Sequence, residues 1–466
     1  MKSRRDQVQA HAYVMGRLTS ALVHGEPDAP ESPTRRTSLG SFGGVMLSAL
    51  AVAGCLIWGL ISPSKSAVFK AGELVQAKET GSRYIFANHE LHPVLNWSSA
   101  MLLMNGNPAI TAVSATSLAS VPQGQPLGIV GAPDALPPAS AVNTGSWLVC
   151  AQQGGGRPIV SLTIGIPVSA SPAKPNAAGL VQTPDGSRYL IFGGHRMKLD
   201  ASWIAGALGL ARAPVIQASA AWLNAVPAAP DLSPIAVTGR GGPGPVLGGH
   251  STRIGQVLVA QNVGSAGQFY LAAAGGITAI SPTQAAVLLG DPATISVYRG
   301  AAVVPVPVST AAIATAHQIR LVMPDGSPAP HSPPVAFTYG AKSPCMDYPA
   351  SGAIVPALVA AQPPAGTPPA VGQTAVSVSP QGAGLISVAA GGGALVRPQA
   401  APGVGGNSLF LVTDAGVKYP IPSATAATAL GYRVGRAARL PAALLGLLPT
   451  GPALNLPAMT QPTPGR

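Results

Sequence analysis

The longest apolar segment of the chain runs from Leu39 to Ile61 and contains no charged residue, and Arg35 and Arg36 stand just ahead of it. A helix rises about 1.5 Å per residue, so about 20 such residues cross the roughly 30 Å hydrocarbon core of a bilayer. The pattern predicts one transmembrane helix over 39–61, with a short segment before it and a large domain after it.

Two other interpretations of this segment remain open. A secretory signal peptide has a shorter apolar run, of about 7–15 residues, behind a shorter leader. The four residues from Val52 to Cys55 also resemble a bacterial lipoprotein cleavage site, which would make Cys55 the lipidated first residue. Because apolar residues continue from Leu56 to Ile61, we favour an uncleaved anchor in which Cys55 is an ordinary small apolar side chain.

The segment ahead of the span predicts one amphipathic helix that ends near Gly25. Its apolar stripe consists of Val8, Met15, Leu18 and Leu22. A single helix has no core of its own, so this stripe must pack on a partner or on a membrane surface. The opposite face is not rich in Lys or Arg, which favours a cytoplasmic protein partner. The prolines that follow predict a stiff connector over 26–38: Pro27, Pro30 and Pro33.

Beyond the span, one pattern recurs four times. Each copy has an aromatic residue leading a short apolar strand, a turn, a second strand and a helix that ends at glycine. The copies occupy 81–106, 186–209, 267–290 and 407–431. The expected helix caps are Asn96, Asp200, Ser281 and Ser423. The expected left-handed closing glycines are Gly106, Gly209, Gly290 and Gly431. Three copies continue into a Leu-to-Pro turn, which the third lacks.

A hairpin with one helix buries too little surface to fold alone, so we expect the four modules to pack on one another or around a centre. The strand-like segments between the modules predict a β-rich central domain: SWLVCAQQ, PIVSLTIG, QIRLVM, PVAFTYG and TAVSVSP. The predicted fold class is therefore α+β. Stretches 227–250 and 361–373 are rich in Pro and Gly and predict linkers.

The predicted organisation has eight parts. Residues 1–38 form the amphipathic helix and connector, and 39–61 form the span. The remaining boundaries are 62–126 for module 1, 127–176 for the first half of the central domain, 177–230 for module 2, 231–304 for a linker and module 3, 305–392 for the second half of the central domain, and 393–466 for module 4 and the C-terminal tail.

Composition supports a folded, loop-rich chain of 466 residues. It contains 56 glycines and 49 prolines without a collagen-like period, and 47% of its residues are hydrophobic. The net charge of +12 is spread along the chain and does not gather into a basic stripe with aromatic platforms, so we expect no nucleic-acid partner.

Only Cys150 and Cys345 lie outside the span. A lone pair in a large domain indicates one disulfide in an oxidising compartment, which would join the two halves of the central domain. The alternative is two unrelated buried thiols.

The sequence contains no phosphate loop of the GxxxxGK[ST] type and no HExxH or CxxC motif. Residues 239–244 match GxGxxG but lie in a predicted linker, and His89 with His92 lack further ligands nearby. We therefore nominate no catalytic, cofactor-binding or metal-binding residue and expect no cofactor. Whether the chain is an enzyme stays open, although we lean against it; the alternatives to a structural role are an unrecognised nucleotide hydrolase and a cell-wall-binding protein.

Taken together, the N-terminal segment QVQAHAYVMGRLTSALVHGEPD with Arg35 and Arg36, the span, the four modules and the Cys150/Cys345 pair resemble the EccB family of type VII (ESX) secretion systems. The resemblance covers essentially the whole chain. His24, Glu26 and the third module depart from the family pattern.

The resemblance implies a single-pass inner-membrane protein with a cytoplasmic N-terminus and a periplasmic bulk. It implies assembly with EccC, EccD, EccE and the mycosin protease, a periplasmic homo-oligomer, and a disulfide between Cys150 and Cys345. Some members of the family are described as ATPases. Because this sequence has no phosphate loop, we expect ATP hydrolysis to belong to EccC.

Overall fold

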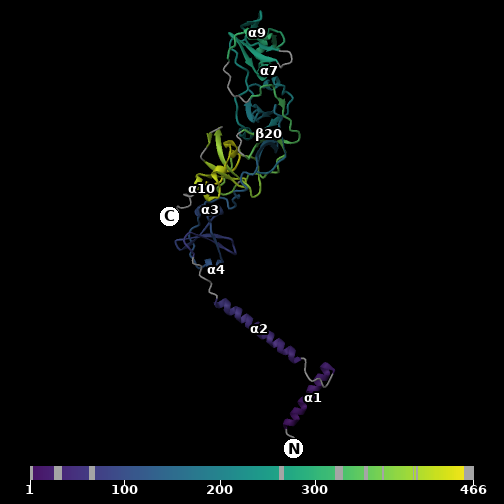
Figure 1. The fold of residues 1–466 in the computed structure, drawn as a ribbon, viewed down its shortest axis with the longest axis vertical. Helices are drawn as coiled ribbons and strands as arrows, with labels where there is room; N and C mark the ends of the chain where they lie inside the picture. Colours follow the sequence, from purple (N-terminus) through teal and green to yellow (C-terminus); the bar gives the residue numbers. More distant parts are fainter. Residues whose placement is uncertain are drawn as a thin grey trace. The chain divides into compact units, whose positions relative to one another are not determined.

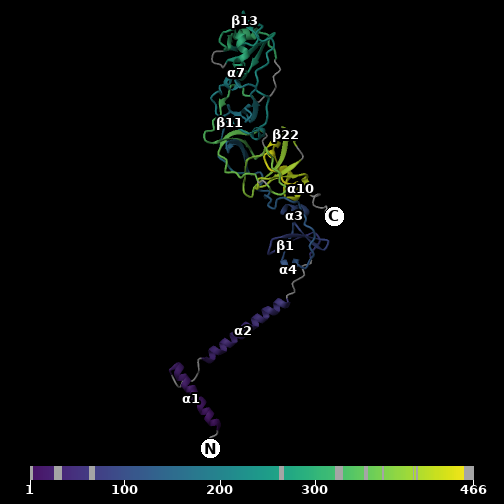
Figure 2. The same cartoon turned by 180° about the vertical axis from the view of Figure 1, so that it is seen from behind.

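The computed structural model describes residues 4–25, 34–61, 69–261, 267–320, 329–350, 355–369, 372–401, 404–405 and 408–455. Contacts divide the chain into an N-terminal unit, Met1–Phe69 with Thr116–Ser120, and a large unit, Lys70–Ala115 with Val121–Arg466. Figures 1 and 2 show α1 and α2 as single helices and the large unit as many short strands and helices. The fold is mixed α+β.

The N-terminal unit contains the two long helices α1 (Arg4–His24) and α2 (Thr34–Ile61). Gly25 ends α1 with a positive φ of 66°, as the sequence predicts. Helix α2 begins ahead of the predicted start at Leu39, so the last residues of the predicted connector are helical. The prolines of that connector, Pro27, Pro30 and Pro33, lie outside the described residues.

The large unit is built on a central six-stranded sheet with the order β21-β6-β5-β19-β20-β7. Its strands are β5 (Trp147–Gly154), β6 (Arg157–Ile164), β7 (Ala170–Pro172), β19 (Ser343–Tyr348), β20 (Ala357–Ala361) and β21 (Leu385–Val388). The sheet therefore combines segments that lie far apart in the sequence, and β5 pairs antiparallel with both β6 and β19.

Alternation along β5 directs its side chains to two faces of this sheet. Trp147, Val149 and Ala151 join the largest hydrophobic core, which also contains α6 (Ala220–Ala225) and α11 (Ala442–Gly446) residues. The indole of Trp222 in α6 is fully buried there, and its Nε1 donates to the carbonyl of Val149 at 3.0 Å. This bond satisfies the polar atom of a buried aromatic ring.

Four smaller sheets share one strand order, in which three antiparallel strands are joined by a strand parallel to the first. The first contains β1 (Glu73–Ala77), β2 (Arg83–Ala87), β3 (Glu90–Pro93) and β4 (Ile110–Val113). The second contains β8 (Ala177–Gln182), β9 (Arg188–Phe192), β10 (His195–Lys198) and β11 (Val215–Gln217). The third contains β14 (Val257–Ala260), β15 (Gln268–Ala273), β16 (Gly276–Ile280) and β17 (Val306–Val308). The fourth contains β22 (Ala394–Ala401), β24 (Leu409–Val412), β25 (Lys418–Ile421) and β26 (Ala438–Pro441).

In each sheet a helix follows the third strand, and a second short helix follows the parallel strand. The first helices are α3 (Trp97–Leu103), α5 (Ile204–Ala207), α7 (Pro282–Gly290) and α10 (Ala424–Ala429). The second helices are α4 (Ala115–Leu118), α6, α9 (Thr310–Thr315) and α11. The helix α8 (Ile295–Tyr298) and the 3-10 turns η1 (Pro292–Thr294) and η2 (Val434–Arg436) complete the connections.

Three of the predicted helix caps are present, and one is wrong. The side chains of Asn96, Ser281 and Ser423 each accept a hydrogen bond from a backbone N–H in the first turn of α3, α7 and α10. Helix α5 instead begins at Ile204, and its cap position, Trp203, makes no side-chain bond. Asp200 therefore does not cap it, because a turn over residues 201–203 separates the two.

Three of the four predicted closing glycines have the expected left-handed conformation, and the fourth does not. Gly106, Gly209 and Gly431 have positive φ values of 80°, 78° and 87°. Gly290 is the last residue of α7 and has no positive φ; the helix ends at Asp291 in an extended conformation. A Cβ at Gly290 would collide with Ala207 of α5, so this glycine permits close packing.

Several predicted boundaries also differ. The predicted linker 227–250 includes β12 (Pro243–Leu247), which forms a hairpin with β13 (His250–Arg253) through the positive-φ pair Gly248 and Gly249. Such a glycine pair suits a two-residue hairpin turn. The prediction of a linker from the Pro and Gly content is therefore wrong for this part of the segment.

Three segments assigned to the central domain pair elsewhere. β18 (Val335–Ala336), from PVAFTYG, is parallel to β8 of the second sheet. Gln318 of QIRLVM bridges to Ile277 of the third sheet, while residues 321–323 lie outside the described ranges, and Ser377 of TAVSVSP bridges to Thr450. β23 (Val404–Gly405) pairs with β22.

Two helix-to-helix contacts join the sheets in pairs. α3 packs on α10, and the two lie side by side in both views (Figures 1 and 2). α5 packs on α7, where Val287 shares a buried cluster with Ile204 and Leu208.

Candidate functional site

The predicted disulfide between Cys150 and Cys345 is present, with 195 residues of sequence separation. The two cysteines face each other across the β5–β19 ladder, and both are fully buried. They lie on the face of the central sheet opposite Trp147 and Val149, in a small cluster with Leu148, Val359 and Ala361. The bond therefore joins the two distant segments at the centre of the large unit.

Helix α2 is the one candidate membrane span in the part of the chain that the structure describes. The candidate span covers Thr37–Trp58 with a mean hydropathy of 1.9, and its most apolar part is not buried against the rest of the protein. Apolar side chains such as Phe42 and Leu50 are exposed around it, which is the pattern of a helix surrounded by lipid. Cys55 is an exposed free thiol within this helix.

The predicted docking residues of α1 lie on a helix as expected. Val8, Met15, Leu18 and Leu22 are all exposed, and Leu22 retains 84% of its surface. Tyr13 and Val14 are exposed as well, so the apolar surface is broader than the predicted stripe. The role of these residues in binding a partner stays a prediction.

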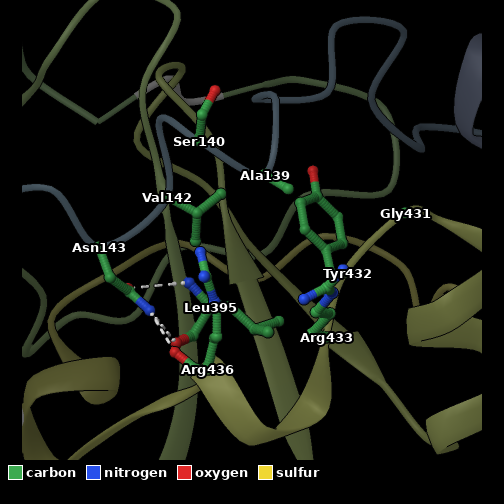
Figure 3. Close-up of a pocket in the computed structure, with 9 residues that line it drawn as sticks. All are labelled: Ala139, Ser140, Val142, Asn143, Leu395, Gly431, Tyr432, Arg433 and Arg436. Carbon is green, nitrogen blue, oxygen red and sulfur yellow. Dashed lines mark hydrogen bonds between the residues drawn. The ribbon is translucent and has the colours of Figure 1, made fainter.

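A pocket of about 370 Å³ opens in the large unit where residues 139–143 meet β22 and the turn after α10. We call it the arginine pocket, and Figure 3 shows its lining. The lining residues are Ala139, Ser140, Val142, Asn143, Leu395, Gly431, Tyr432, Arg433 and Arg436.

Asn143 links two of the segments that line the arginine pocket through hydrogen bonds. Its Nδ2 donates to the carbonyl oxygens of Leu395 and Arg436, both at 3.0 Å, and its Oδ1 accepts from the N–H of Leu395 at 3.1 Å. These are the dashed bonds in Figure 3. Asn143 has a φ of 58°, a left-handed conformation that Asn tolerates better than most residues. Three bonds from one side chain hold the pocket walls in a fixed arrangement.

Tyr432 links the residues after α10 to the segment that contains Pro137. Its ring is buried, and its hydroxyl donates to the carbonyl of Pro137 at 2.8 Å. Burial raises the pKa of Tyr432, so the phenol stays neutral and remains a donor at physiological pH. Gly431, with its positive φ, turns the chain out of α10 immediately before this residue.

Arg433 and Arg436 supply the charge of the pocket. Arg433 immediately precedes η2 and Arg436 ends it, and the N–H of Arg436 donates to the carbonyl of Arg433 at 3.0 Å. Arg433 is itself in an extended conformation, with a φ of −92° and a ψ of 116°, and both arginine side chains line the pocket. Both arginines are exposed, and none of the described residues that line the pocket is Asp or Glu.

No pattern in the sequence predicted this pocket. Residues near 140 and near 433 are far apart in the sequence and belong to loops, so no periodicity connects them. The available signal was the short spacing of Arg433 and Arg436 just after a predicted helix end.

A second, larger hollow of about 780 Å³ lies between the β5–β6 turn, the β8–β9 turn and α6. Arg157 and Arg196 line it together with Asp185 and apolar side chains such as Tyr189 and Leu223. The hydroxyls of Thr183 and Ser187 donate to the carboxylate of Asp185 and lower its pKa, so Asp185 carries a negative charge here. The charges of this hollow are therefore mixed, unlike those of the arginine pocket.

Within the described ranges, no three His, Cys, Asp or Glu side chains gather as metal ligands would. Of the two histidines weighed as a metal pair, His92 has its Nδ1 2.9 Å from the carbonyl oxygen of Gln125. The expectation of no metal, cofactor or catalytic residue stays a prediction.

Comparison with known proteins gives a consistent result. A family model described as "Type VII secretion system ESX-1, transport TM domain B" matches residues 2–461. The chain is 29% identical over 299 residues to the ESX-3 secretion system ATPase EccB3 of Mycolicibacterium smegmatis, a match that covers 61% of this chain and 56% of that one. It is 30% identical over 293 residues to the ESX-2 secretion system ATPase EccB2 of Mycobacterium tuberculosis, which covers 60% and 57%. The matched region thus spans little more than half of these curated relatives.

Solved structures share the fold. The "EccB3 dimer from the ESX-3 core complex" matches with a TM-score of 0.65 and 25% identity over 83% of this chain and 99% of that one. A chain of the intact ESX-5 inner membrane complex matches with a TM-score of 0.64 and 24% identity, over 100% of this chain and 96% of that chain. With the family match over almost the whole sequence, a β-rich large unit and one candidate span, this chain belongs to the EccB family of type VII secretion systems.

Proposed function

We propose that the chain is a structural membrane component of a type VII (ESX) secretion complex, anchored in the inner membrane and supporting protein export. The observation that carries this proposal is the combination of one exposed apolar helix, α2, with a large unit closed by the Cys150–Cys345 disulfide. The relatives of this fold are described as parts of an ESX-5 inner membrane complex and its periplasmic assembly.

The proposed orientation places α1 in the cytoplasm and the large unit in the periplasm. A disulfide persists in an oxidising compartment, and Arg35 with Arg36 precede the span, as basic residues do on the cytoplasmic side. Thiol trapping in intact cells tests this arrangement. Cys150 and Cys345 should be found oxidised, whereas a reduced pair in freshly trapped cells would count against a periplasmic location.

We further propose that the four sheets with their helices are copies of one repeat around the central sheet. Their common strand order supports this, as does the recurrence of two short helices at the same places. Modules 1 to 4 would then begin at the parallel-paired strands β1, β8, β14 and β22. In the third copy, Gln318, which follows α9, bridges to Ile277 of β16. The chain therefore returns to its sheet after the second helix, although the sequence of this copy lacks the Leu-to-Pro turn of the other three.

The proposed partners are EccC, EccD, EccE, the mycosin protease and further copies of this chain. The exposed apolar residues of α1 would contact the cytoplasmic partners, and the large unit would oligomerise. The related EccB3 structure of the ESX-3 core complex is a dimer, which supports self-association.

Removal of residues 4–25 tests the scaffold function. We expect the truncated chain to stay in the membrane through α2, to keep its disulfide and to lose co-purification with the other components. Native gels of detergent extracts provide the measurement. A matched Val8→Ser, Leu18→Ser variant should weaken assembly, whereas Gln9→Ser on a polar position should not. An undiminished complex from the truncated chain would contradict the proposal.

A further inference from the structure

We propose that the arginine pocket binds a carboxylate side chain in an acidic segment of a partner protein. Arg433 and Arg436 place two guanidinium groups on one short turn, both exposed and both lining the same pocket of about 370 Å³. Positive charges that line the same pocket repel one another, and none of the lining residues that the structure describes is a carboxylate that would offset them. An anion that enters the pocket removes this repulsion and gains charge-assisted hydrogen bonds.

The pocket is preorganised for such a ligand. Asn143 ties the carbonyl of Arg436 and both backbone groups of Leu395 to residue 143, and Tyr432 is bonded to Pro137. The backbone that carries the two arginines is therefore fixed before binding, and only their side chains need to be ordered. Preorganisation of this kind lowers the entropic cost of association.

The lining favours a carboxylate side chain. Guanidinium forks match the planar carboxylate in a two-point geometry. Ala139, Val142 and Leu395 provide apolar surface for the methylene groups of an acidic residue or its neighbour. Guanidinium groups also bind phosphate, but the apolar surface beside them suits the methylene groups of an acidic side chain, and competition with inorganic phosphate distinguishes the two anions.

Charge also indicates the source of the ligand. This chain has 27 Lys and Arg against 15 Asp and Glu, so another copy of it is a poor donor of acidic segments. A different protein with an acidic, partly apolar segment is the complementary partner. Binding is measured on the purified chain alone, so its failure would leave the proposed secretion function untouched.

The test is calorimetric titration of the full chain in detergent with the peptide acetyl-Glu-Leu-Glu-Leu-Glu-amide. We expect binding that weakens as salt rises, and a glutamine version of the peptide should bind at least tenfold more weakly. The double variant Arg433→Ala, Arg436→Ala should raise the Kd about tenfold or more, since two hydrogen-bonded ion pairs are lost. Arg433→Lys with Arg436→Lys should recover only part of the affinity, because lysine keeps the charge but not the fork.

Arg439→Ala is the matched control, because Arg439 is exposed, close in sequence and outside the pocket. Its Kd should stay within about twofold of the unchanged chain. Equal binding by the double alanine variant, or an equal loss with Arg439→Ala, would overturn the site. Displacement of the peptide by inorganic phosphate or ATP at lower concentration than the peptide itself requires would overturn the choice of a carboxylate.

Discussion

Lys418 shows how the fourth sheet accommodates a partly buried charge. Its ammonium group donates to the carbonyl of Leu445, and burial lowers its pKa. Because the folded state binds this proton less tightly than the unfolded chain, the buried charge costs stability at neutral pH. That cost is fully present below the folded pKa and disappears as pH rises through it toward the ordinary value of 10.5.

Replacement of Lys418 by Met should therefore stabilise the protein at pH 7. The carbonyl of Leu445 keeps a hydrogen bond from the N–H of Leu448, so no acceptor is left without a donor. The gain should shrink near pH 10.5, where the native lysine loses its own proton. Thermal unfolding at the two pH values measures this difference. Lys198→Met, on an exposed lysine, should change little at either pH, and a destabilised Lys418→Met at pH 7 would contradict a net cost of the buried charge.

At the scale of elements, the α5–α7 contact shows how short helices join neighbouring sheets. Each helix buries its apolar side against the other, with Val287 of α7 in the same cluster as Ile204 and Leu208. Gly290 allows the close approach, because a side chain there would run into Ala207 and lie against Trp203. The sequence marked Gly290 as a helix end, but its role is to leave room for another helix.

Gly290→Leu should force α5 and α7 apart and expose the apolar surface between them. A clash of this size in a packed contact typically costs about 1–3 kcal/mol. Hydrogen exchange should become faster in both helices and remain unchanged in α3 and α10. Gly206→Ala in α5 is the control, since a Cβ there meets nothing within 4 Å and should leave exchange unchanged or slower. Unaltered exchange in Gly290→Leu would show that the contact does not hold the sheets together.

At the scale of the whole large unit, the Cys150–Cys345 bond encloses the second and third sheets within one covalent loop. The first and fourth sheets lie outside this loop and meet through α3 and α10. The bond joins β5, where the chain first enters the central sheet, to β19, where it returns after the second and third sheets. It thereby limits the freedom of the long intervening segment in the unfolded chain.

Cys150→Ala with Cys345→Ala should lower stability by about 5 kcal/mol in the chain-entropy account of a loop this long. The β5–β19 ladder and the Trp222 contact remain, so we expect a folded but less stable protein. Thermal unfolding and gel mobility with and without reductant provide the measurements. Cys55→Ser, in α2, should leave the unfolding of the large unit unchanged. An unaltered melting temperature in the double variant would contradict a stabilising role.

The sequence by itself determined the features that depend on local chemistry. An uncharged apolar run specifies a helix suited to a bilayer, the residues of α1 repeat at helical spacing, and Asn96, Ser281 and Ser423 can cap helices because their partners are a few residues away. The strand-like segments around Cys150 likewise form strands, β5 and β6. The same local logic failed at Asp200, where a turn intervenes before α5.

Only the tertiary structure decided which distant segments meet. β18 joins the second sheet and Ser377 pairs near α11, although their sequences fit a central strand equally well, because a strand's pattern specifies its faces but not its neighbour. The arginine pocket has the same origin. Asn143 and Arg436 are 293 residues apart, and their contact depends on how the sheets pack, which no local periodicity encodes.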